Sequence, residues 1–273
     1  MPRSFTSRKG IHWIEEGPAV GAPVVVLIHG LGGEAQFWAV EQKALAASFR
    51  VLAVDLRGSG RSPGASAAFS IEDLADDIIS VLDDANVASA HVVGFSMGGV
   101  VAQALALAAP DRVERLVLAA TFAATNPQAR LFLEAIGWVY RDGASAKQLY
   151  GLVLPWLFSM TFLSDPRSLP YVAYPEDQEG EQSREDWLRL LDALLAFDGR
   201  ERLSGIDAPT LIICGDEDCL APLAGAKELA EGIEGSLLRI VTGGHLMNIE
   251  SPDEFVGHIE AFLSPDACQA LIT

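Results

Sequence analysis

A serine in the sequence G-F-S-M-G-G, residues 94–99, is the first residue whose surroundings could support chemistry. Ser96 lies between two apolar runs, H-V-V and V-V-A-Q-A-L-A, a pattern that predicts a strand, a tight turn and a helix. On such a turn G-x-S-x-G forms a nucleophile elbow, because the glycines relieve crowding around the serine backbone. Ser96 is therefore the candidate nucleophile.

A serine hydroxyl is a weak nucleophile at neutral pH, so it needs a general base, usually a histidine that an acceptor orients. His245 is the best candidate base, since it follows a predicted strand on a Gly-Gly loop, downstream of acidic residues after the preceding strand. Asp216 and Asp218 are both candidates for the acid, and their chemistry alone does not choose between them. The chain order is then Ser, Asp, His. The other histidines fit less well: His12, His29, His91 and His258.

Two backbone amides are candidates for an oxyanion hole. Attack on a carbonyl places negative charge on its oxygen, which aimed N–H groups stabilise. The turn after Ser96 offers the N–H of Met97, and the loop H-G-L-G-G at 29–33 offers the N–H of Leu31. In the same loop, His29 is predicted to brace the backbone rather than to transfer protons.

The elements that must position these residues alternate between strands and helices. Near-continuous apolar strands separated by helices predict an α/β fold with a mostly parallel central sheet that is flanked by helices on both faces. Ligands of such sheets bind beyond the carboxyl ends of the strands, where every candidate residue falls. The predicted strands are 23–28, 50–55, 90–94, 112–120, 208–215 and 236–241, and the predicted helices are 34–48, 70–85, 97–109, 222–232 and 251–263.

Local signals refine two of these helices and mark one interruption. Ser70 and Asp73 form a near capping box, and Ser251 precedes Pro252 as the N-cap of the last helix. After Thr121 the alternation breaks for about 75 residues, which read as helices with Pro and Gly punctuation. We therefore expect one core with a helical insertion.

Composition excludes several functional classes. The chain has 273 residues, of which half are apolar, and a formal charge of −18, which argues against a nucleic-acid partner. The N-terminus lacks the apolar region of a secretory signal, and no apolar stretch approaches a membrane span, so we expect a cytoplasmic protein without membrane association. Three cysteines without metal-type spacing suggest neither disulfides nor a zinc site. We expect no metal and no cofactor.

Taken together, these motifs resemble the α/β-hydrolase family from about Val24 to Leu263. Four motifs match in order, at 29–33, 55–62, 94–99 and 243–245. The acid in these enzymes commonly reads G-x-x-D-x-x-x-P, which the chain matches at 215–222 and which favours Asp218, with Asp216 in reserve. The resemblance also implies that D-x-R-G-x-G-x-S at 55–62 is a structural turn rather than part of the site.

The resemblance further implies a hydrolase core at 1–121 and 201–273 and a helical cap at 122–200. The most apolar segment of the cap is 149–163, interrupted by Pro155. It either packs the cap onto the core or a partner subunit, or lines an apolar pocket over Ser96. The aromatic residues predicted to line that pocket are Trp138, Trp156, Phe158 and Phe162.

Two stretches, V-A-Q-A-L-A-L-A-A-P-D-R-V-E-R-L-V-L-A-A-T and F-D-G-R-E-R-L-S-G-I-D-A-P-T-L, look most similar to 3-oxoadipate enol-lactonases and aminoacrylate hydrolases. This implies a serine hydrolase that cleaves a small carboxylic ester or enol-lactone through an acyl-enzyme. An enol-lactonase would need a cation for the substrate carboxylate, whereas an apolar cap without one would favour a neutral ester. The basic residues of the cap that are candidates for this cation are Arg130, Arg141, Lys147, Arg167, Arg184 and Arg189.

Other activities of the same fold stay open. They are a thioester, amide-type or carbon–carbon hydrolase, an acyltransferase or perhydrolase, and a non-catalytic ligand-binding receptor. Phe95 lowers the carbon–carbon option, because those enzymes tend to have Asn before the nucleophile. The expected partner is a small-molecule substrate, and the protein is expected to be a monomer or homodimer.

Overall fold

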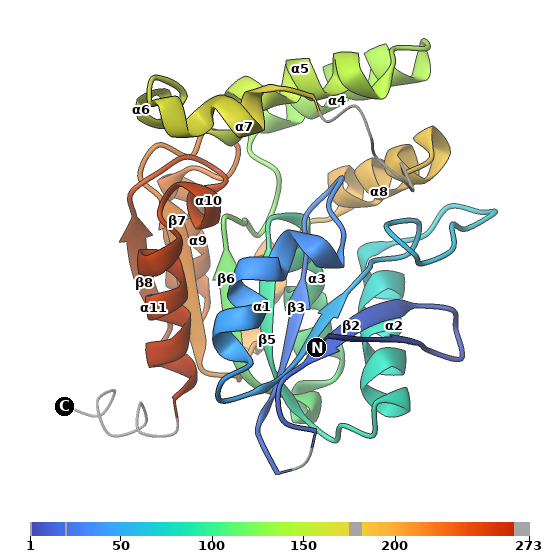
Figure 1. Ribbon diagram of the computed structural model, residues 1–273, viewed down its shortest axis with the longest axis vertical. Coiled ribbons are helices and arrows are strands. Elements are labelled where there is room, and N and C mark those ends of the chain that lie inside the picture. Colours follow the sequence, from blue (N-terminus) through green and yellow to red (C-terminus); the bar gives the residue numbers. More distant parts are fainter. Residues whose placement is uncertain (1, 20, 175–181, 265–273) are drawn as a thin grey trace.

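The computed structural model describes residues 2–19, 21–174 and 182–264, and its strands form one eight-stranded sheet (Figure 1). The order across the sheet is β1-β2-β4-β3-β5-β6-β7-β8. The strands are β1 (Arg3–Thr6), β2 (His12–Glu16), β3 (Val24–Ile28), β4 (Arg50–Val54), β5 (Ala90–Phe95), β6 (Val113–Ala119), β7 (Thr210–Gly215) and β8 (Leu237–Val241).

The predicted mostly parallel sheet is confirmed. From β4 through β3, β5, β6 and β7 to β8, every neighbouring pair is parallel. The central strands β5 and β7 are buried along their whole length, which explains their near-continuous apolar sequences. Parallel strands end at one edge, so the loops after β3, β5, β7 and β8 meet there.

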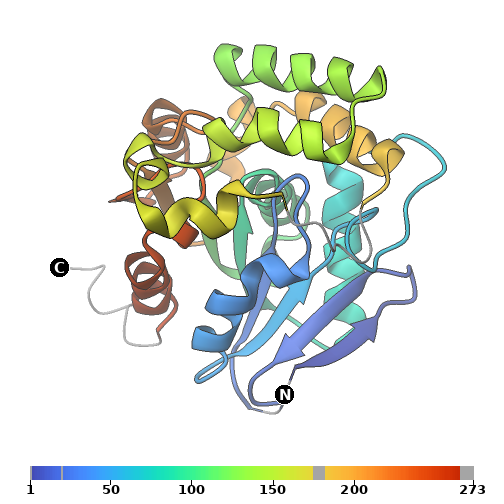
Figure 2. The ribbon, with the colours of Figure 1, turned by 45° about the horizontal axis from the view of Figure 1, so that its top comes forward.

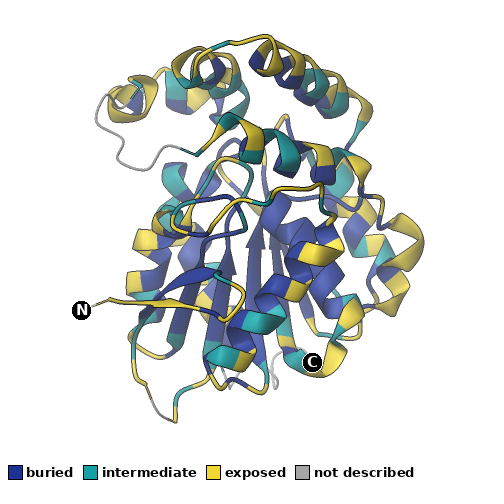
Figure 3. Ribbon diagram, turned by 90° about the vertical axis from the view of Figure 1, so that its right-hand side faces the viewer, coloured by how far each residue is buried: buried dark blue, intermediate teal, exposed yellow. Residues whose placement is uncertain are grey.

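Helices cover both faces of the sheet, and the apolar core lies between the layers, as the burial colours of Figure 3 make visible. The amphipathic helix between β4 and β5 buries Ile71, Leu74, Ile78 and Val81 on the stripe that faces the sheet. One face carries α1 (Ala39–Leu45) and α11 (Pro252–Leu263), and the other carries α2 (Ile71–Asp84), α3 (Met97–Ala108) and α9 (Leu223–Gly232).

A group of helices lies between β6 and β7 along the chain and above the carboxyl ends of the strands (Figures 1 and 2). An isolated antiparallel bridge between Ala124 and Asp198 joins the segments that enter and leave this group. The division into a core at 1–121 and 201–273 and a cap at 122–200 stays a prediction. The helices are α4 (Pro127–Arg141), α5 (Ala146–Leu157), α6 (Met160–Leu163), α7 (Leu169–Val172) and α8 (Arg184–Ala196).

Short helical elements complete the described chain. The predicted helix 34–48 begins as the 3-10 helix η1, and α1 already ends at Leu45. A short helix, α10, lies just after the loop of His245. These elements are η1 (Ala35–Trp38), η2 (Pro110–Arg112), η3 (Pro166–Ser168), η4 (Arg200–Gly205) and α10 (Met247–Glu250).

The N-terminal hairpin was missing from the predicted elements. Strands β1 and β2 pair with each other antiparallel, and β2 also pairs antiparallel with the edge of β4. All four residues of β1, R-S-F-T, are exposed, so this strand lacks the apolar run that marked the others. Backbone pairing to an existing sheet edge holds it instead.

The two predicted helix starts differ in outcome. The capping box of Ser70 and Asp73 is confirmed, with both reciprocal hydrogen bonds present. Ser251 is the N-cap residue of α11 and Pro252 takes the first helical position, as predicted, but the Ser251 side chain makes no capping hydrogen bond. Its hydroxyl donates to the carbonyl of Thr242 at 2.8 Å, because the chain reaches α11 directly from α10 rather than from an extended segment.

No helix within the described part of the chain is long and apolar enough to cross a membrane. The cytoplasmic location and the monomeric or homodimeric state stay predictions.

Candidate active site

Ser96 lies at the turn between β5 and α3 with a strained backbone. Its φ of 54° and ψ of −119° are a conformation that a residue with a side chain rarely adopts and that costs about 1–3 kcal/mol. A Cβ at Gly94 would collide with the backbone of Gly98, and a Cβ at Gly98 with the carbonyl of Ile28. The glycines around Ser96 are therefore required by the close approach of strand and helix.

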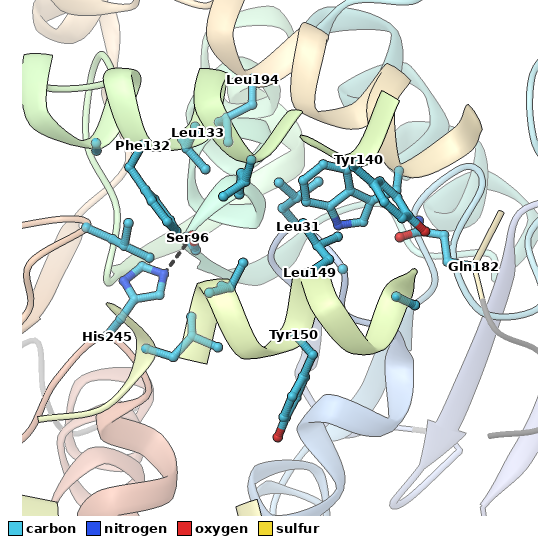
Figure 4. A pocket seen from close by; sticks show the side chains of 18 of the residues that line it. Leu31, Ser96, Phe132, Leu133, Tyr140, Leu149, Tyr150, Gln182, Leu194 and His245 are labelled. Carbon is cyan, nitrogen blue, oxygen red and sulfur yellow. Dashed lines mark hydrogen bonds between the residues drawn. The ribbon is translucent and has the colours of Figure 1, made fainter. Parts of the chain in front are cut away.

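The imidazole of His245 bridges Ser96 and Asp218. Its Nε2 lies 3.0 Å from the Ser96 Oγ, and its Nδ1 lies 2.9 Å from an Asp218 carboxylate oxygen. A carboxylate accepts from Nδ1–H, so this contact leaves Nε2 free to accept the serine proton. Figure 4 draws the contact between Ser96 and His245 at one end of a cavity.

The Asp218 carboxylate is fixed on its other side by backbone amides. Its second oxygen accepts from the N–H groups of Leu220 and Ala221 at 2.9 and 2.8 Å, and the residue is 5% exposed. Asp216 is exposed, and its carboxylate accepts from the Gly243 amide at 2.8 Å. Of the two candidate acids, only Asp218 contacts the imidazole. Asp216 instead binds the Gly243 amide of the loop that carries His245.

The loop after β3 approaches the serine closely. A Cβ at Gly30 would lie 3.1 Å from the Ser96 Cβ, and Gly32 has a φ of 75°, a value that favours glycine. Leu31 and Ser96 line the same cavity, and Met97 begins α3 directly after Ser96. Neither the Leu31 nor the Met97 amide has a hydrogen-bond acceptor among the described residues.

His29 holds this loop against the end of β4. Its Nε2 accepts from the Leu56 amide at 3.1 Å, so the ring carries its proton on Nδ1, which donates to the Gly30 carbonyl at 2.7 Å. Burial lowers the pKa of His29, while the Gly30 carbonyl and Asp55 act in the opposite direction. The ring is neutral and works as a brace.

The segment 55–62 forms a hydrogen-bonded turn rather than a part of the site. The Asp55 carboxylate accepts from the amides of Ala35 and Arg61 at 2.6 and 3.0 Å. The Ser62 hydroxyl donates to the Asp55 carbonyl at 2.7 Å. Arg57 forms a two-pronged ion pair with Asp77 on α2, with both N–O distances at 2.8 Å.

A cavity of about 330 Å³ extends from Ser96 and His245 beneath helices α4, α5 and α8 (Figure 4). Its described wall is mostly aliphatic and aromatic. It includes three tyrosines and His245, but no Asp, Glu, Lys or Arg side chain. The lining residues are Leu31, Gly32, Ser96, Phe122, Ala129, Phe132, Leu133, Ile136, Tyr140, Ala146, Leu149, Tyr150, Val153, Leu157, Tyr174, Gln182, Trp187, Leu194, Leu220 and His245.

The four aromatic residues predicted to line the pocket are not part of this wall. Trp138 is 68% exposed on the outer side of α4. Trp156 stacks behind Phe132, which takes the wall position, with ring centroids 4.3 Å apart. Phe158 and Phe162 stack on each other at 5.1 Å, where the end of α5 packs on α6. The prediction was wrong because it ranked residues by apolar character, whereas helix rotation decides which face points inward.

The wall residues on α4 share a helical spacing that the prediction did not use. Ala129, Leu133, Ile136 and Tyr140 repeat at intervals of four, three and four on α4 and form its inner face. That spacing is present in the sequence, although nothing local says whether this face or its opposite covers the site.

None of the basic residues named for the cap lines the cavity among the described residues. Arg130 donates to the Leu195 carbonyl, Arg141 pairs with Asp192, and Arg167 pairs with Asp165. The remaining members of this set are Lys147, Arg184, which donates to the Ala144 carbonyl, and Arg189, which pairs with Asp186.

Both described cysteines, Cys214 and Cys219, are free thiols. Cys214 is buried in β7, where desolvation, with Asp218 and Asp216, raises the pKa of its thiol to about 12. Cys219 is exposed beside Asp218, and Cys268 lies outside the described residues. Within the described ranges, no group of three or more His, Cys, Asp or Glu side chains could hold a metal ion.

Comparison with known proteins places this geometry in a family. The pattern of the family described as alpha/beta hydrolase fold matches residues 23–252. A putative carbamate hydrolase RutD of Azorhizobium caulinodans is 35% identical, over 86% of this chain and 88% of the relative. Another putative carbamate hydrolase RutD, of Yersinia enterocolitica, is 32% identical, over 90% of this chain and 88% of the relative. The crystal structure of the enol-lactonase from Burkholderia xenovorans LB400 superposes with a TM-score of 0.87 and 31% identity, covering 96% of this chain and 99% of that one.

Proposed function

Since the chain belongs to the alpha/beta hydrolase fold family and is a hydrolase, we propose that it cleaves a small, uncharged carboxylic ester or lactone through an acyl-enzyme. Ser96 is the nucleophile, His245 the general base and Asp218 the residue that orients it. The amides of Leu31 and Met97 form the oxyanion hole. The observation that carries this proposal is the hydrogen-bonded series from Asp218 through His245 to Ser96.

The reaction follows from this geometry in two stages. The Ser96 Oγ attacks the ester carbonyl while Nε2 of His245 takes its proton, and the carbonyl oxygen becomes an oxyanion. The protonated imidazole then gives that proton to the departing alcohol, which leaves an acyl group on Ser96. Water, deprotonated by the same imidazole, attacks the acyl carbon. The bond to Ser96 then breaks, the imidazolium returns the proton to the Ser96 Oγ, and the acid leaves.

The two proposed oxyanion donors have complementary origins. The Met97 amide is at the N-terminus of α3, where the helix leaves its first N–H groups without partners. The Leu31 amide belongs to the loop that His29 braces against β4. Because both amides lack a protein acceptor among the described residues, they are free to bind developing charge.

The wall of the cavity supports an uncharged substrate. A substrate carboxylate buried there would lose its hydration without gaining a cation, because no arginine or lysine lines the described wall. An ester or lactone with an apolar acyl group instead buries its hydrocarbon against Phe132, Leu133 and Leu149. We also propose that residues 122–200 act as a cap domain that forms this wall over the core.

The relatives named as putative carbamate hydrolases favour carbamate hydrolysis as a second candidate. The same residues would act on that carbonyl, because a carbamate carbonyl also develops an oxyanion when attacked. We place carbamate hydrolysis below ester hydrolysis because the wall of the cavity is large and apolar.

The first experiment compares Ser96→Ala with the wild-type protein on two matched esters. These are p-nitrophenyl hexanoate and the mono-p-nitrophenyl ester of adipic acid, which differ in the carboxylate at the far end of the acyl chain. We expect the wild type to favour the neutral ester in kcat/KM by roughly tenfold or more, because the carboxylate would be buried unpaired. Ser96→Ala should reduce hydrolysis of both esters to the uncatalysed rate.

A matched control is Ser89→Ala, which removes a surface hydroxyl that contacts Glu114 and should leave kcat/KM unchanged. Turnover that persists in Ser96→Ala would contradict the serine mechanism. Equal kcat/KM for the two esters would contradict the uncharged substrate. Faster sustained turnover of an N-alkyl p-nitrophenyl carbamate would promote the second candidate.

A further inference from the structure

Glu250 joins the loop of His245 to the corner between α5 and α6. It is the last residue of α10 and is 8% exposed. One carboxylate oxygen accepts from the Gly244 amide at 3.0 Å and from the Ser159 amide at 2.8 Å. The other oxygen accepts from the Ser159 hydroxyl at 2.5 Å. A single buried side chain thus links the residue before His245 to the helices above the sheet.

The residue after His245 is held by the same corner. The Leu246 amide donates to the Leu157 carbonyl at 2.8 Å. Both chain neighbours of His245 are therefore bound to the segment Leu157–Ser159, one directly and one through Glu250. These two contacts hold the backbone of His245 in place, and with it the position from which the side chain reaches Ser96.

The close approach of the two segments depends on Gly244. A Cβ at this position would lie 2.5 Å from the Ser159 nitrogen and 2.7 Å from the Phe158 carbonyl carbon. The backbone of the corner therefore packs directly on the backbone of the His245 loop, with no side chain between them. Residue 244 is therefore a glycine because of this packing, and not because of a role in the reaction.

The acid loop has a parallel but more exposed contact with the same corner. Glu217, which precedes Asp218, accepts from the Met160 amide at 3.2 Å and from the Thr161 hydroxyl at 2.9 Å. Its own amide donates to the Gly243 carbonyl at 2.9 Å. The two loops that carry Asp218 and His245 are thus bound to each other and to one stretch of the cap helices.

From these contacts we infer that Glu250 is a positioning residue, which orients His245 by binding its loop to the α5–α6 corner. The inference rests on the proposed function, in which His245 is the base. It means that the cap helices do more than line the cavity, because their docking sets the direction of the imidazole toward Ser96. Loss of the Glu250 carboxylate removes the acceptor shared by Gly244 and Ser159 and lets the loop move.

The test compares Glu250→Ala, Glu250→Gln and Ser159→Ala with the wild type on p-nitrophenyl hexanoate. Glu250→Ala should lower kcat by roughly 10- to 100-fold with KM within about threefold, because a misplaced base slows chemistry more than binding. Glu250→Gln keeps an oxygen for both amides and should recover most of kcat. Ser159→Ala keeps the bond to Gly244 and should lose less than Glu250→Ala.

A second readout needs no turnover. In the proton NMR spectrum, the low-field resonance of the His245 Nδ1–H, identified by its absence in His245→Asn, should broaden or shift in Glu250→Ala and return in Glu250→Gln. The control is Glu254→Ala, whose carboxylate faces the Thr242 amide of the same loop at 3.4 Å but not the cap, and which should keep both kcat and the resonance.

Three results separate this inference from the proposed function. Unchanged kcat and an unchanged resonance in folded Glu250→Ala would overturn the inference while Ser96→Ala still abolishes turnover. A rise in KM alone would also overturn it, since that is what a purely structural role in the pocket roof would produce. Retained turnover in Ser96→Ala would overturn the proposed function, whereas the resonance would still report whether Glu250 fixes the ring.

Discussion

Asp218 and Asp216 are the same residue type two positions apart, and their surroundings give them different work. The Asp218 carboxylate is buried, receives two backbone amides and faces the imidazole of His245. The Asp216 carboxylate is exposed and receives the Gly243 amide instead. At the scale of a residue, therefore, neighbours rather than chemical type decide the role.

Asp218→Asn tests this difference. We expect kcat to fall by about 10⁴-fold with the fold intact, because an amide nitrogen that faces Nδ1 favours the tautomer in which Nε2 carries the proton. The measurement is kcat on a p-nitrophenyl ester, with circular dichroism to check the fold. Asp216→Asn is the matched control and should keep kcat within a few-fold. Similar losses in both variants would mean that the loop as a whole, not the Asp218 contact, supports the base.

At the scale of the element, the loop after β3 depends on a neutral histidine. His29 accepts from Leu56 and donates to Gly30, an arrangement that is possible only while one ring nitrogen is unprotonated. Burial lowers the pKa of His29 below the ordinary value of 6.5. The folded state therefore resists protonation more than the unfolded state, and the loop that offers the Leu31 amide is sensitive to acid.

The sign of this effect follows from proton linkage. Above pH 6.5 His29 is neutral in both states, and its contribution to the free energy of unfolding is fully present. As the pH falls below 6.5 the unfolded chain binds a proton first, so the free energy of unfolding decreases, by at most about 1.4 kcal/mol per pH unit. Urea unfolding of the wild type and His29→Gln between pH 7.5 and about 5 should give a flatter profile for the variant. Parallel profiles would exclude His29 as the source of acid sensitivity.

Helix α4 shows which property of an element the sequence leaves open. The elements around Ser96 could be predicted because each strand has a continuous apolar run and each turn has its own glycines. The inner face of α4 could not be chosen, because the sequence places a large aromatic residue on each face, Trp138 on one and Phe132 on the other. Only packing against α8 and the core decides which of them is covered.

At the scale of the whole molecule, the dominant property is charge. The chain has 37 acidic and 19 basic residues, for a formal charge of −18. A field of this sign repels anionic ligands over a distance set by the ionic strength. It acts together with the uncharged wall of the cavity, and both favour a neutral substrate.

Salt dependence separates the long-range field from the local wall. Between ionic strengths of about 0.01 and 0.15 M the screening length falls from about 30 to 8 Å. We expect kcat/KM for the mono-p-nitrophenyl ester of adipic acid to rise over this range, while that for p-nitrophenyl hexanoate stays constant. The preference for the neutral ester should therefore narrow but persist. A preference that vanishes with salt would assign the selectivity to the net charge alone.

The sequence by itself determined the parallel strands of the sheet, the elbow at Ser96 and the order of the loops that carry Leu31, Asp218 and His245. Those features are local: an apolar strand, a glycine-lined turn and the residue that follows a strand are properties of neighbouring residues in the chain. The tertiary structure decided which acid faces His245, which face of the helices between β6 and β7 lines the cavity, and that Glu250 bridges Gly244 and Ser159. Those features depend on contacts between segments far apart in sequence, which form only when the helices dock on the sheet.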